Sequence, residues 1–353
     1  MKKRYFHEIV SWDLPKKTER SIYLGKIAEA KLLQETEAYL PIDELCKHMI
    51  IAGSTGGGKT ITAQIIAEEA LAKNISTLVV DPTAQWTGII KPLSEESIKK
   101  RYELFGMKKD SIRGYPARIL TLDSGAEINN IGSLLKPGEI TILNSISLAE
   151  KDIDAIAVNI VEGIFRKVPA ETQELNTLIF FEEIHRILPK YGGTGKGLIA
   201  LERAVREFRK WGIGIILISQ VLDDFAGEIR ANIGTEMQLR TSYEFDLNKI
   251  RLKYGDAIAK AVVREETGTA MMHNSNYNIG QPFFILIRPP YHDVHKLPES
   301  DLKKYALLSE KIEKLEKQGL SEQDMLNIKM ARKELEKLNF AVAELHLSEI
   351  KKN

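Results

Sequence analysis

The segment from Gly53 to Thr60 constrains the fold of this chain more than any other feature. It reads Gly-Ser-Thr-Gly-Gly-Gly-Lys-Thr and lies between a short apolar run and a helix-like stretch. A glycine-rich turn in this setting lets successive backbone N–H groups surround a phosphate, and the start of a helix adds partial positive charge. The segment therefore predicts a phosphate loop that binds a nucleoside triphosphate.

The last two residues of the loop have specific expected roles. Lys59 is expected to reach the β- and γ-phosphates, and the Thr60 hydroxyl is expected to ligate Mg²⁺. ATP and Mg²⁺ are accordingly the expected ligands. The residues predicted to contact the nucleotide are Gly53, Ser54, Thr55, Gly56, Gly57, Gly58, Lys59, Thr60 and Ile61.

The composition of the 353 residues is that of a soluble globular protein. No apolar run approaches the roughly 20 residues that a membrane-spanning helix needs, and the single cysteine, Cys46, excludes an intrachain disulfide. The N-terminus does not form a signal peptide, so a cytoplasmic location is expected. The formal net charge of +1 argues mildly against tight DNA binding by a monomer. It does not exclude a ring whose basic residues gather in a central channel.

Short apolar runs alternate with helix-like stretches from about residue 48 to residue 289. This alternation predicts an α/β protein with a mostly parallel sheet flanked by helices. Several runs are apolar throughout, as expected for strands that are buried on both faces. The expected strands span residues 22–27, 37–40, 49–52, 77–80, 118–122, 140–143, 178–181, 214–219, 237–239, 269–272 and 283–287.

Three parts are expected along the chain. Residues 1–45 form a short β-rich flanking element, residues 46–298 form the nucleotide-binding domain, and residues 299–353 form a helical hairpin. The C-terminal part is rich in lysine and glutamate, with leucines at near-helical spacing and a break at Gly319. Packing of this hairpin on its own domain is favoured over a coiled coil with a partner, and both alternatives stay open.

Two adjacent carboxylates, Glu182 and Glu183, follow the apolar run 177–181. A nucleotide-hydrolysing site needs acids at the end of such a strand, one on the magnesium side and one that activates water. By position Glu182 takes the magnesium-side role and Glu183 the role of general base. The alternative is a solvated pair at a strand end. Asp81, at the end of another strand, is either a strand-end cap or a contact of the magnesium shell.

Further polar residues accompany the next buried strand. Gln220 ends this strand and is expected to sense the γ-phosphate or orient the attacking water. Arg203, Arg206 and Arg209 precede it at three-residue spacing, which places them on one slowly drifting helix face. They are candidates for arginine fingers or for a stripe that faces DNA. An exposed basic helix face is the alternative.

A glycine-rich loop at residues 188–197 resembles a second phosphate loop only superficially. It does not follow a strand, and Gly197 stands where a metal-binding hydroxyl would be needed, so this interpretation is rejected. Lys190 and Lys196 are instead candidates for DNA contact, with a plain surface loop as the alternative. His292 and His295 lack further ligands nearby and are expected to lie in a solvated turn.

Taken in order, these motifs resemble a known family over about residues 22–290. The phosphate loop, the segment Asp81-Pro-Thr-Ala-Gln-Trp86, the run Glu182-Glu-Ile-His185 and the Arg209-Lys-Trp-Gly-Ile-Gly stretch are similar to the HerA–FtsK superfamily, and most similar to its HerA branch. Two departures stand out. Fewer than 50 residues precede the loop, where HerA proteins usually carry a β-barrel, and Ile184 replaces a small residue.

The resemblance implies a RecA-like P-loop NTPase core, a homohexameric ring with ATP sites between subunits, and double-stranded DNA in the pore. It implies that Glu183 is the catalytic acid, Gln220 the sensor and Arg209 the finger that acts on a neighbouring subunit. Arg240 is a second candidate for an interface role. The short N-terminal region weakens the expectation that a nuclease partner docks on the ring.

The expected function is ATP hydrolysis that drives double-stranded DNA through a ring, as in a HerA-like helicase or translocase. One alternative is an ATPase that powers conjugation, secretion or DNA packaging, because such proteins share the same core motifs. Another is a nucleotide-dependent switch or scaffold whose helical tail binds a protein partner. The paired carboxylates count against the switch, since it needs no efficient hydrolysis.

Overall fold

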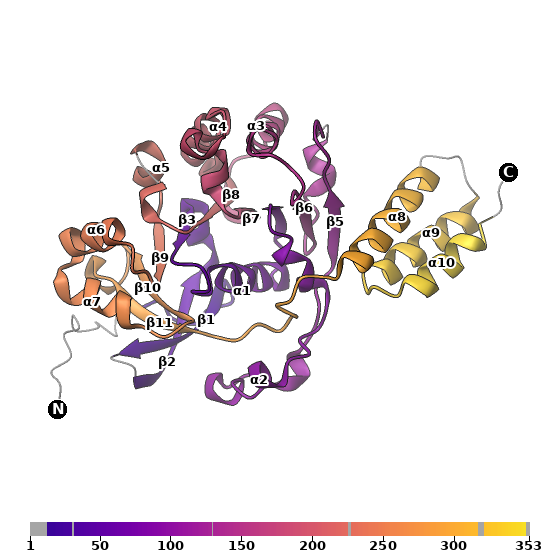
Figure 1. Ribbon diagram of the computed structural model, residues 1–353. Helices are drawn as coiled ribbons and strands as arrows, with labels where there is room; N and C mark the ends of the chain where they lie inside the picture. The colour runs from indigo at the N-terminus through magenta and orange to yellow at the C-terminus, as the bar shows by residue number, and fades with distance from the viewer. Residues whose placement is uncertain (1–12, 30–31, 129, 225–226, 317–320, 351–353) are drawn as a thin grey trace.

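The computed structural model describes residues 13–29, 32–128, 130–224, 227–316 and 321–350. Its centre is a mixed sheet of 11 strands (Figure 1). The strands are β1 (Ser21–Glu29), β2 (Leu32–Pro41), β3 (Met49–Ala52), β4 (Ser76–Asp81), β5 (Ala117–Thr121), β6 (Ile140–Asn144), β7 (Thr172–Phe181), β8 (Trp211–Ser219), β9 (Thr235–Leu239), β10 (Thr269–Asn274) and β11 (Phe283–Ile287).

Helices α1–α7 lie between the strands in the sequence, and three more helices follow the last strand. They are α1 (Lys59–Ala72), α2 (Glu96–Lys99), α3 (Glu150–Lys167), α4 (Lys196–Glu207), α5 (Gly227–Ala231), α6 (Glu244–Tyr254), α7 (Asp256–Arg264), α8 (Glu299–Glu316), α9 (Glu322–Leu335) and α10 (Phe340–Ser348). Within the described ranges, no helix combines the length and the apolar character that crossing a bilayer requires.

The strand order is β2-β1-β11-β10-β9-β3-β8-β7-β4-β6-β5. All neighbours from β9 to β5 are parallel, whereas β10, β11, β1 and β2 pair antiparallel. The predicted fold class, a mostly parallel sheet flanked by helices, is therefore confirmed. Of the predicted element at residues 1–45, the first 12 residues lie outside the described part. Its strands β1 and β2 extend the main sheet through the β1–β11 pairing.

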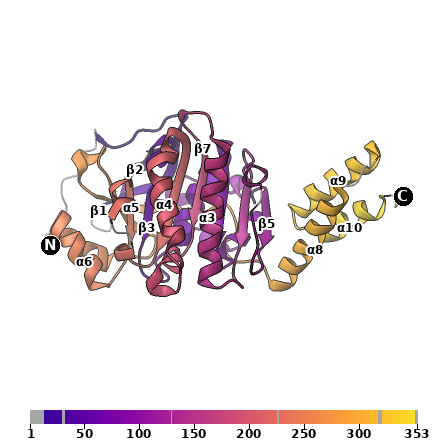
Figure 2. The same ribbon diagram turned by 90° about the horizontal axis from the view of Figure 1, so that it is seen from above.

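Both faces of the sheet are covered by helices. Helix α1 packs on one face, and α3 and α4 pack on the other (Figure 1), and Figure 2 shows α3 and α4 side by side over their face. Strand β3 serves both cores: Met49 and Ile51 join the cluster that contains α1, while Ile50 and Ala52 join the cluster of α3 and α4. Burial on both sides explains why this strand is apolar throughout.

The parallel order also positions the polar loops. The carboxyl ends of β3, β8 and β7 meet at one edge of the sheet, because these neighbouring strands run in the same direction. The phosphate loop follows β3, Gln220 follows β8, and the two carboxylates follow β7. The fold therefore gathers these three segments at a single edge.

The C-terminal helices α8, α9 and α10 extend beyond β5, at the far end of the sheet from α6 and α7 (Figures 1 and 2). Two helices were expected here, and the structure adds α10 as a third. The buried hydroxyl of Tyr305 on α8 donates to the backbone oxygen of Ala117 at 2.9 Å. Arg118 of β5 also forms an ion pair with Glu313 of α8 at 2.5 Å. Helix α8 thus packs on its own domain, against the edge strand β5.

A buried ionic cluster ties α1 to the segment after β11. Arg288 has no exposed side-chain surface and contacts Glu68 and Glu69 of α1, each at 2.9 Å. The Nδ1 atom of His292 lies 2.6 Å from Glu68, and its Nε2 atom lies 3.2 Å from Gln64. Burial opposes ionisation of Glu68, but the charges of Arg288 and His292 outweigh it and lower the pKa of this carboxyl.

This cluster corrects one expectation. A solvated turn was predicted for His292 and His295, yet His292 is completely buried. His295 does lie at the surface, with 69% of its side chain exposed. The spacing of the two histidines carried no information about Glu68, which is 224 residues away in the sequence.

The substitution Arg288→Met is expected to lower the free energy of unfolding by about 3–5 kcal/mol. The reason is that the Glu68 carboxylate stays buried but loses its guanidinium partner. Urea denaturation measures the effect. As a matched control, Arg332→Met removes a partly exposed pair with Glu316 at 2.8 Å and is expected to cost less than about 1 kcal/mol. Equal unfolding midpoints for Arg288→Met and the wild type would show that the buried Arg288–Glu68 ion pair does not stabilise the fold.

Candidate nucleotide-binding site

The predicted phosphate loop connects β3 to α1 in a conformation that requires glycine. Gly58 caps α1 with a φ of 97°, in the left-handed region that disfavours side chains. Gly53 has a φ of 151°, and a side-chain Cβ there would lie 3.0 Å from the Cβ of Leu239. Helix α1 is 14 residues long, so its N-terminus presents unpaired N–H groups and partial positive charge to the loop.

Lys59 is the first residue of α1 and is largely buried beside the loop. Its Nζ donates to the backbone oxygen of Ser54 at 3.3 Å. Burial lowers the pKa of Lys59, although the nearby charges of Glu183 and Glu182 raise it. The sequence predicts that this ammonium group meets phosphates, and the structure places it between the loop and the two carboxylates.

Thr60 and Glu182 are 122 residues apart in the sequence, and the fold brings them into contact. The Thr60 hydroxyl donates to Oε1 of Glu182 at 2.9 Å. The indole Nε1 of Trp86 donates to Oε2 of the same carboxylate at 3.0 Å. Glu182 is only 3% exposed, and burial raises its pKa to about 7 despite the hydrogen bonds from Trp86 and Thr60. Glu182 is therefore not a solvated carboxylate at a strand end.

The paired oxygens of Thr60 and Glu182 fit a magnesium site. Mg²⁺ prefers oxygen ligands and is usually held by one or two carboxylates together with substrate phosphates. Across the described ranges, no cluster of three or more His, Cys, Asp or Glu side chains offers a metal cage made by protein alone. The hydroxyl and the carboxylate supply two oxygens, so an Mg²⁺ ion held here would take its other ligands from a nucleotide and from water.

Glu183 lies beside the sensor residue predicted from the sequence. Its backbone has a φ of 49° and a ψ of 51°, which turns the chain sharply after β7. Its Oε2 lies 3.1 Å from Nδ1 of His185 and accepts a hydrogen bond from Nε2 of Gln220 at 3.4 Å. Burial acts to raise the pKa of Glu183, but His185, Lys59 and Gln220 together bring it below the ordinary value. An ionised carboxylate at this position has the protonation state that a general base requires.

Two residues of the Asp81–Trp86 segment complete this site. Asp81 is fully buried, and its carboxylate accepts from the backbone N–H of Thr83 at 3.0 Å and of Trp86 at 2.9 Å. These hydrogen bonds are those of a strand-end cap, the first of the two alternatives for this residue. Sequence reasoning assigned no role to Trp86, because nothing in a single sequence relates its indole to a carboxylate 96 residues away.

The two candidate interface arginines lie at opposite edges of the sheet. Arg240 follows β9, and its backbone oxygen accepts from the N–H of Ser54 in the phosphate loop at 3.0 Å. Arg209 precedes β8. The 9 residues of β8 span roughly 30 Å, so Arg209 lies far from the loop of its own chain. Arg209 therefore does not contact the phosphate loop of its own chain.

The four residues predicted to contact DNA fall into two groups. Lys190 lies between β7 and α4 and pairs with Asp224 at 2.9 Å, and Lys196 is the first residue of α4. Arg203 of α4 pairs with Glu162 at 3.2 Å and stacks on Phe165, and Arg206 pairs with Glu228 of α5. These acidic partners favour the alternative of an exposed charged helix face for the two arginines. Helix α4 begins at Lys196, whose side chain is exposed.

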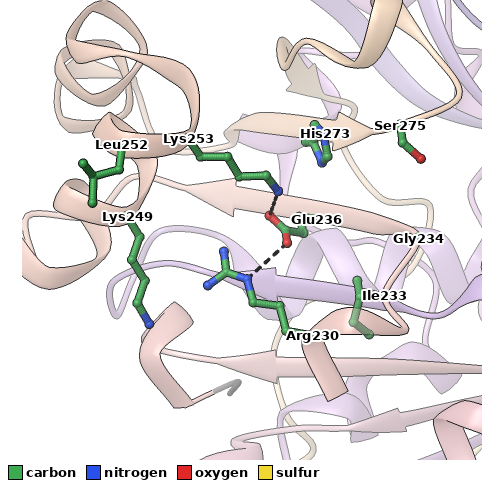
Figure 3. Close-up of a pocket in the computed structure, with 9 residues that line it drawn as sticks. All are labelled: Arg230, Ile233, Gly234, Glu236, Lys249, Leu252, Lys253, His273 and Ser275. Carbon is green, nitrogen blue, oxygen red and sulfur yellow. Dashed lines mark hydrogen bonds and ion pairs between the residues drawn. The ribbon is translucent and has the colours of Figure 1, made fainter. Parts of the chain in front are cut away.

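A shallow hollow of about 550 Å³ lies at the other edge of the sheet, between α5, α6 and the start of β9 (Figure 3). Its floor holds Glu236, which pairs with Arg230 and Lys253, each at 3.4 Å. Gly234 donates to the backbone oxygen of Lys47 just before β3, which fixes the hollow at the edge opposite the phosphate loop. The hollow is therefore separate from the nucleotide site.

Comparison with known proteins agrees with this geometry. Residues 22–100 match the family model of the helicase HerA central domain. Among curated proteins, none matches the sequence. The structure of VirB4 of Thermoanaerobacter pseudethanolicus is similar at a TM-score of 0.50 and 14% sequence identity, covering 77% of this chain and 97% of VirB4.

Two further solved structures are similar at lower TM-scores. The genome packaging NTPase B204 from Sulfolobus turreted icosahedral virus 2, in complex with AMPPCP, has a TM-score of 0.41 and 13% identity, covering 67% of this chain and 96% of B204. EccC of Thermomonospora curvata has a TM-score of 0.47 and 11% identity, covering 79% of this chain and 45% of EccC. Both scores are below 0.5, whereas the fold similarity to VirB4 reaches 0.50. The resemblance predicted from the motifs is confirmed: residues 22–100 are similar to the central domain of HerA, within a RecA-like P-loop ATPase fold.

Proposed function

We propose that this chain is an ATP-hydrolysing, ring-forming motor that moves double-stranded DNA. The observation that carries the proposal is the convergence of three strand ends on the phosphate loop. Glu182 contacts Thr60 at 2.9 Å, and Glu183 contacts Gln220 at 3.4 Å, so both acids lie where a bound triphosphate would end. A protein that only binds a nucleotide has no need for a second, ionised acid beside a Gln-ended strand.

In this proposal each residue of the site has one task. Lys59 and the loop N–H groups bind the phosphates, and Thr60 and Glu182 hold Mg²⁺, which supplies charge compensation on the phosphate oxygens. Glu183 accepts a proton from the attacking water, and Gln220 orients that water. The bond from His185 keeps the Glu183 carboxylate ionised and directed toward the site.

The ring follows from the position of Arg209 in this proposal. A transition state with spread negative charge needs a cation close to the γ-phosphate. Arg209 lies at the opposite end of β8 from Gln220, so it serves a neighbouring copy of the chain. A closed ring gives every loop such an arginine, and a homohexamer is the assembly that the HerA resemblance indicates.

DNA is the cargo that the family match favours. Lys190 and Lys196 follow β7, the strand that carries the two acids. Hydrolysis of the nucleotide would therefore take place close to two lysines that are suited to contact DNA phosphates. Motors for conjugation, secretion or packaging are the alternative, because such proteins share the same core motifs. DNA-independent hydrolysis would favour a secretion-type cargo.

The substitution Glu183→Gln is expected to reduce ATP turnover by at least about 100-fold, because the amide cannot accept the proton. ATP affinity is expected to stay within a few fold of the wild type, since the loop is intact. Steady-state hydrolysis and equilibrium binding by calorimetry measure the two effects. Lys59→Ala is the matched contrast, in which binding itself weakens. Wild-type hydrolysis by Glu183→Gln would show that the base is elsewhere.

A mixing experiment tests whether Arg209 acts on a neighbouring subunit. Arg209→Ala and Glu183→Gln chains are each expected to be inactive alone, but a mixed ring contains interfaces with an intact Glu183 and an intact Arg209. Hydrolysis is therefore expected to recover partially when the two variants are mixed. Arg206→Ala, which removes an exposed ion pair with Glu228, serves as the control and should stay active. If the mixture stayed inactive, Arg209 would not act in trans.

A further inference from the structure

Two exposed aromatic side chains lie at the start of α6. Tyr243 is 41% exposed and Phe245 is 64% exposed. Their ring centroids are 5.4 Å apart, with the planes tilted by 38°. Paired aromatic rings on the surface beside a ligand site are suited to binding a planar group, because their faces stay available for stacking.

The backbone connects this pair directly to the phosphate loop. Arg240 accepts the hydrogen bond from Ser54, and a Cβ on Gly57 would lie 3.6 Å from the same carbonyl oxygen. Tyr243 follows Arg240 by three residues, and three residues span at most roughly 11 Å. The Cα atoms of Arg240 and Tyr243 are therefore at most about 11 Å apart, which places the Tyr243 backbone near the loop.

The sheet order gives the direction in which a nucleotide must extend. Lys59 and Thr60 face the carboxylates at the end of β7, so the γ-phosphate end points toward β7. Strand β3 lies between β8 and β9 in the sheet. The ribose and base of a nucleotide held this way extend from the loop to the opposite side, over the end of β9, where Tyr243 and Phe245 lie.

The start of α6 is also fixed in place. The buried carboxylate of Asp246 accepts a hydrogen bond from the backbone N–H of Leu222 at 3.0 Å. Leu222 follows Gln220, so this bond attaches the aromatic turn to the segment after the sensor residue. The backbone N–H of Tyr243 donates to the Thr241 hydroxyl at 3.2 Å. The Asp246 bond attaches the first turn of α6 to another segment of the protein, and the Thr241 bond shapes the backbone just before the rings.

We propose that Tyr243 and Phe245 form the stacking platform for the base of the nucleotide that the phosphate loop binds. This inference rests on the proposed function, because it assumes a nucleoside triphosphate at Lys59. Stacking reads the flat face of a base, which every base has, so the platform discriminates weakly between adenine and guanine. A purine offers a larger face than a pyrimidine and binds more tightly.

The test compares two ligands, ATP and inorganic tripolyphosphate, on the full chain. Tyr243→Ala and Phe245→Ala are each expected to weaken ATP binding by roughly 5- to 100-fold, while tripolyphosphate binds as it does to the wild type. Tyr243→Phe keeps the ring and is expected to retain ATP affinity. Leu252→Ala, at the other end of α6 where the side chain is 89% exposed, is the control and should change neither affinity.

The outcomes separate this inference from the proposed function. If Lys59→Ala weakens neither ligand, the loop is not the nucleotide site and the proposed function fails. If Lys59→Ala weakens both ligands but the alanine variants bind ATP normally, only the platform is refuted. Equal weakening of ATP and tripolyphosphate would also overturn it, because the loop itself would then be distorted. An altered subunit number with unchanged ATP affinity would identify the rings as a subunit contact instead.

Discussion

The hydrogen bond between Thr60 and Glu182 is the interaction on which the site depends. It joins the first turn of α1 to the end of β7 across the intervening strand β8. Because β8 lies between these two elements, Gln220, which follows β8, lies beside Glu183. The Trp86 indole donates to the other oxygen of Glu182, so both oxygens of this carboxylate accept a hydrogen bond. The order of three parallel strands thus produces the spacing that phosphoryl transfer needs.

Helix α1 is fixed at two points along its length. Its first turn carries Lys59 and Thr60, and its last two turns carry Glu68 and Glu69, which pair with the buried Arg288. The chain that contains Arg288 continues to α8 and the C-terminal helices. The phosphate loop is therefore connected through one rigid helix to the part of the molecule that lies beyond β5. At the carboxyl ends of the parallel strands, the Arg240 segment also contacts the phosphate loop, through the backbone N–H of Ser54.

Much of the fold could be predicted from the sequence, because strands buried on both faces appear as apolar runs. The phosphate loop and the acids after β7 were also predictable, since carboxyl ends of parallel strands meet at one edge. The sequence predicts a helix in this region, but the break between α9 and α10 was missed, because no glycine or proline marks the turn at Leu338, whose φ is 61°. The indole of Trp86 and the burial of His292 were missed for another reason. Their partners lie 96 and 224 residues away, and only the folded chain brings them together.

ATP hydrolysis with and without long double-stranded DNA, at low and moderate salt, tests the central claim most directly. A motor whose basic groups contact DNA phosphates is expected to hydrolyse ATP several-fold faster with DNA. This stimulation should fade as salt is added, because counterions compete for the phosphates, and basal as well as stimulated hydrolysis should be lost in Glu183→Gln. Brisk hydrolysis that is indifferent to DNA at both salt concentrations would contradict the account.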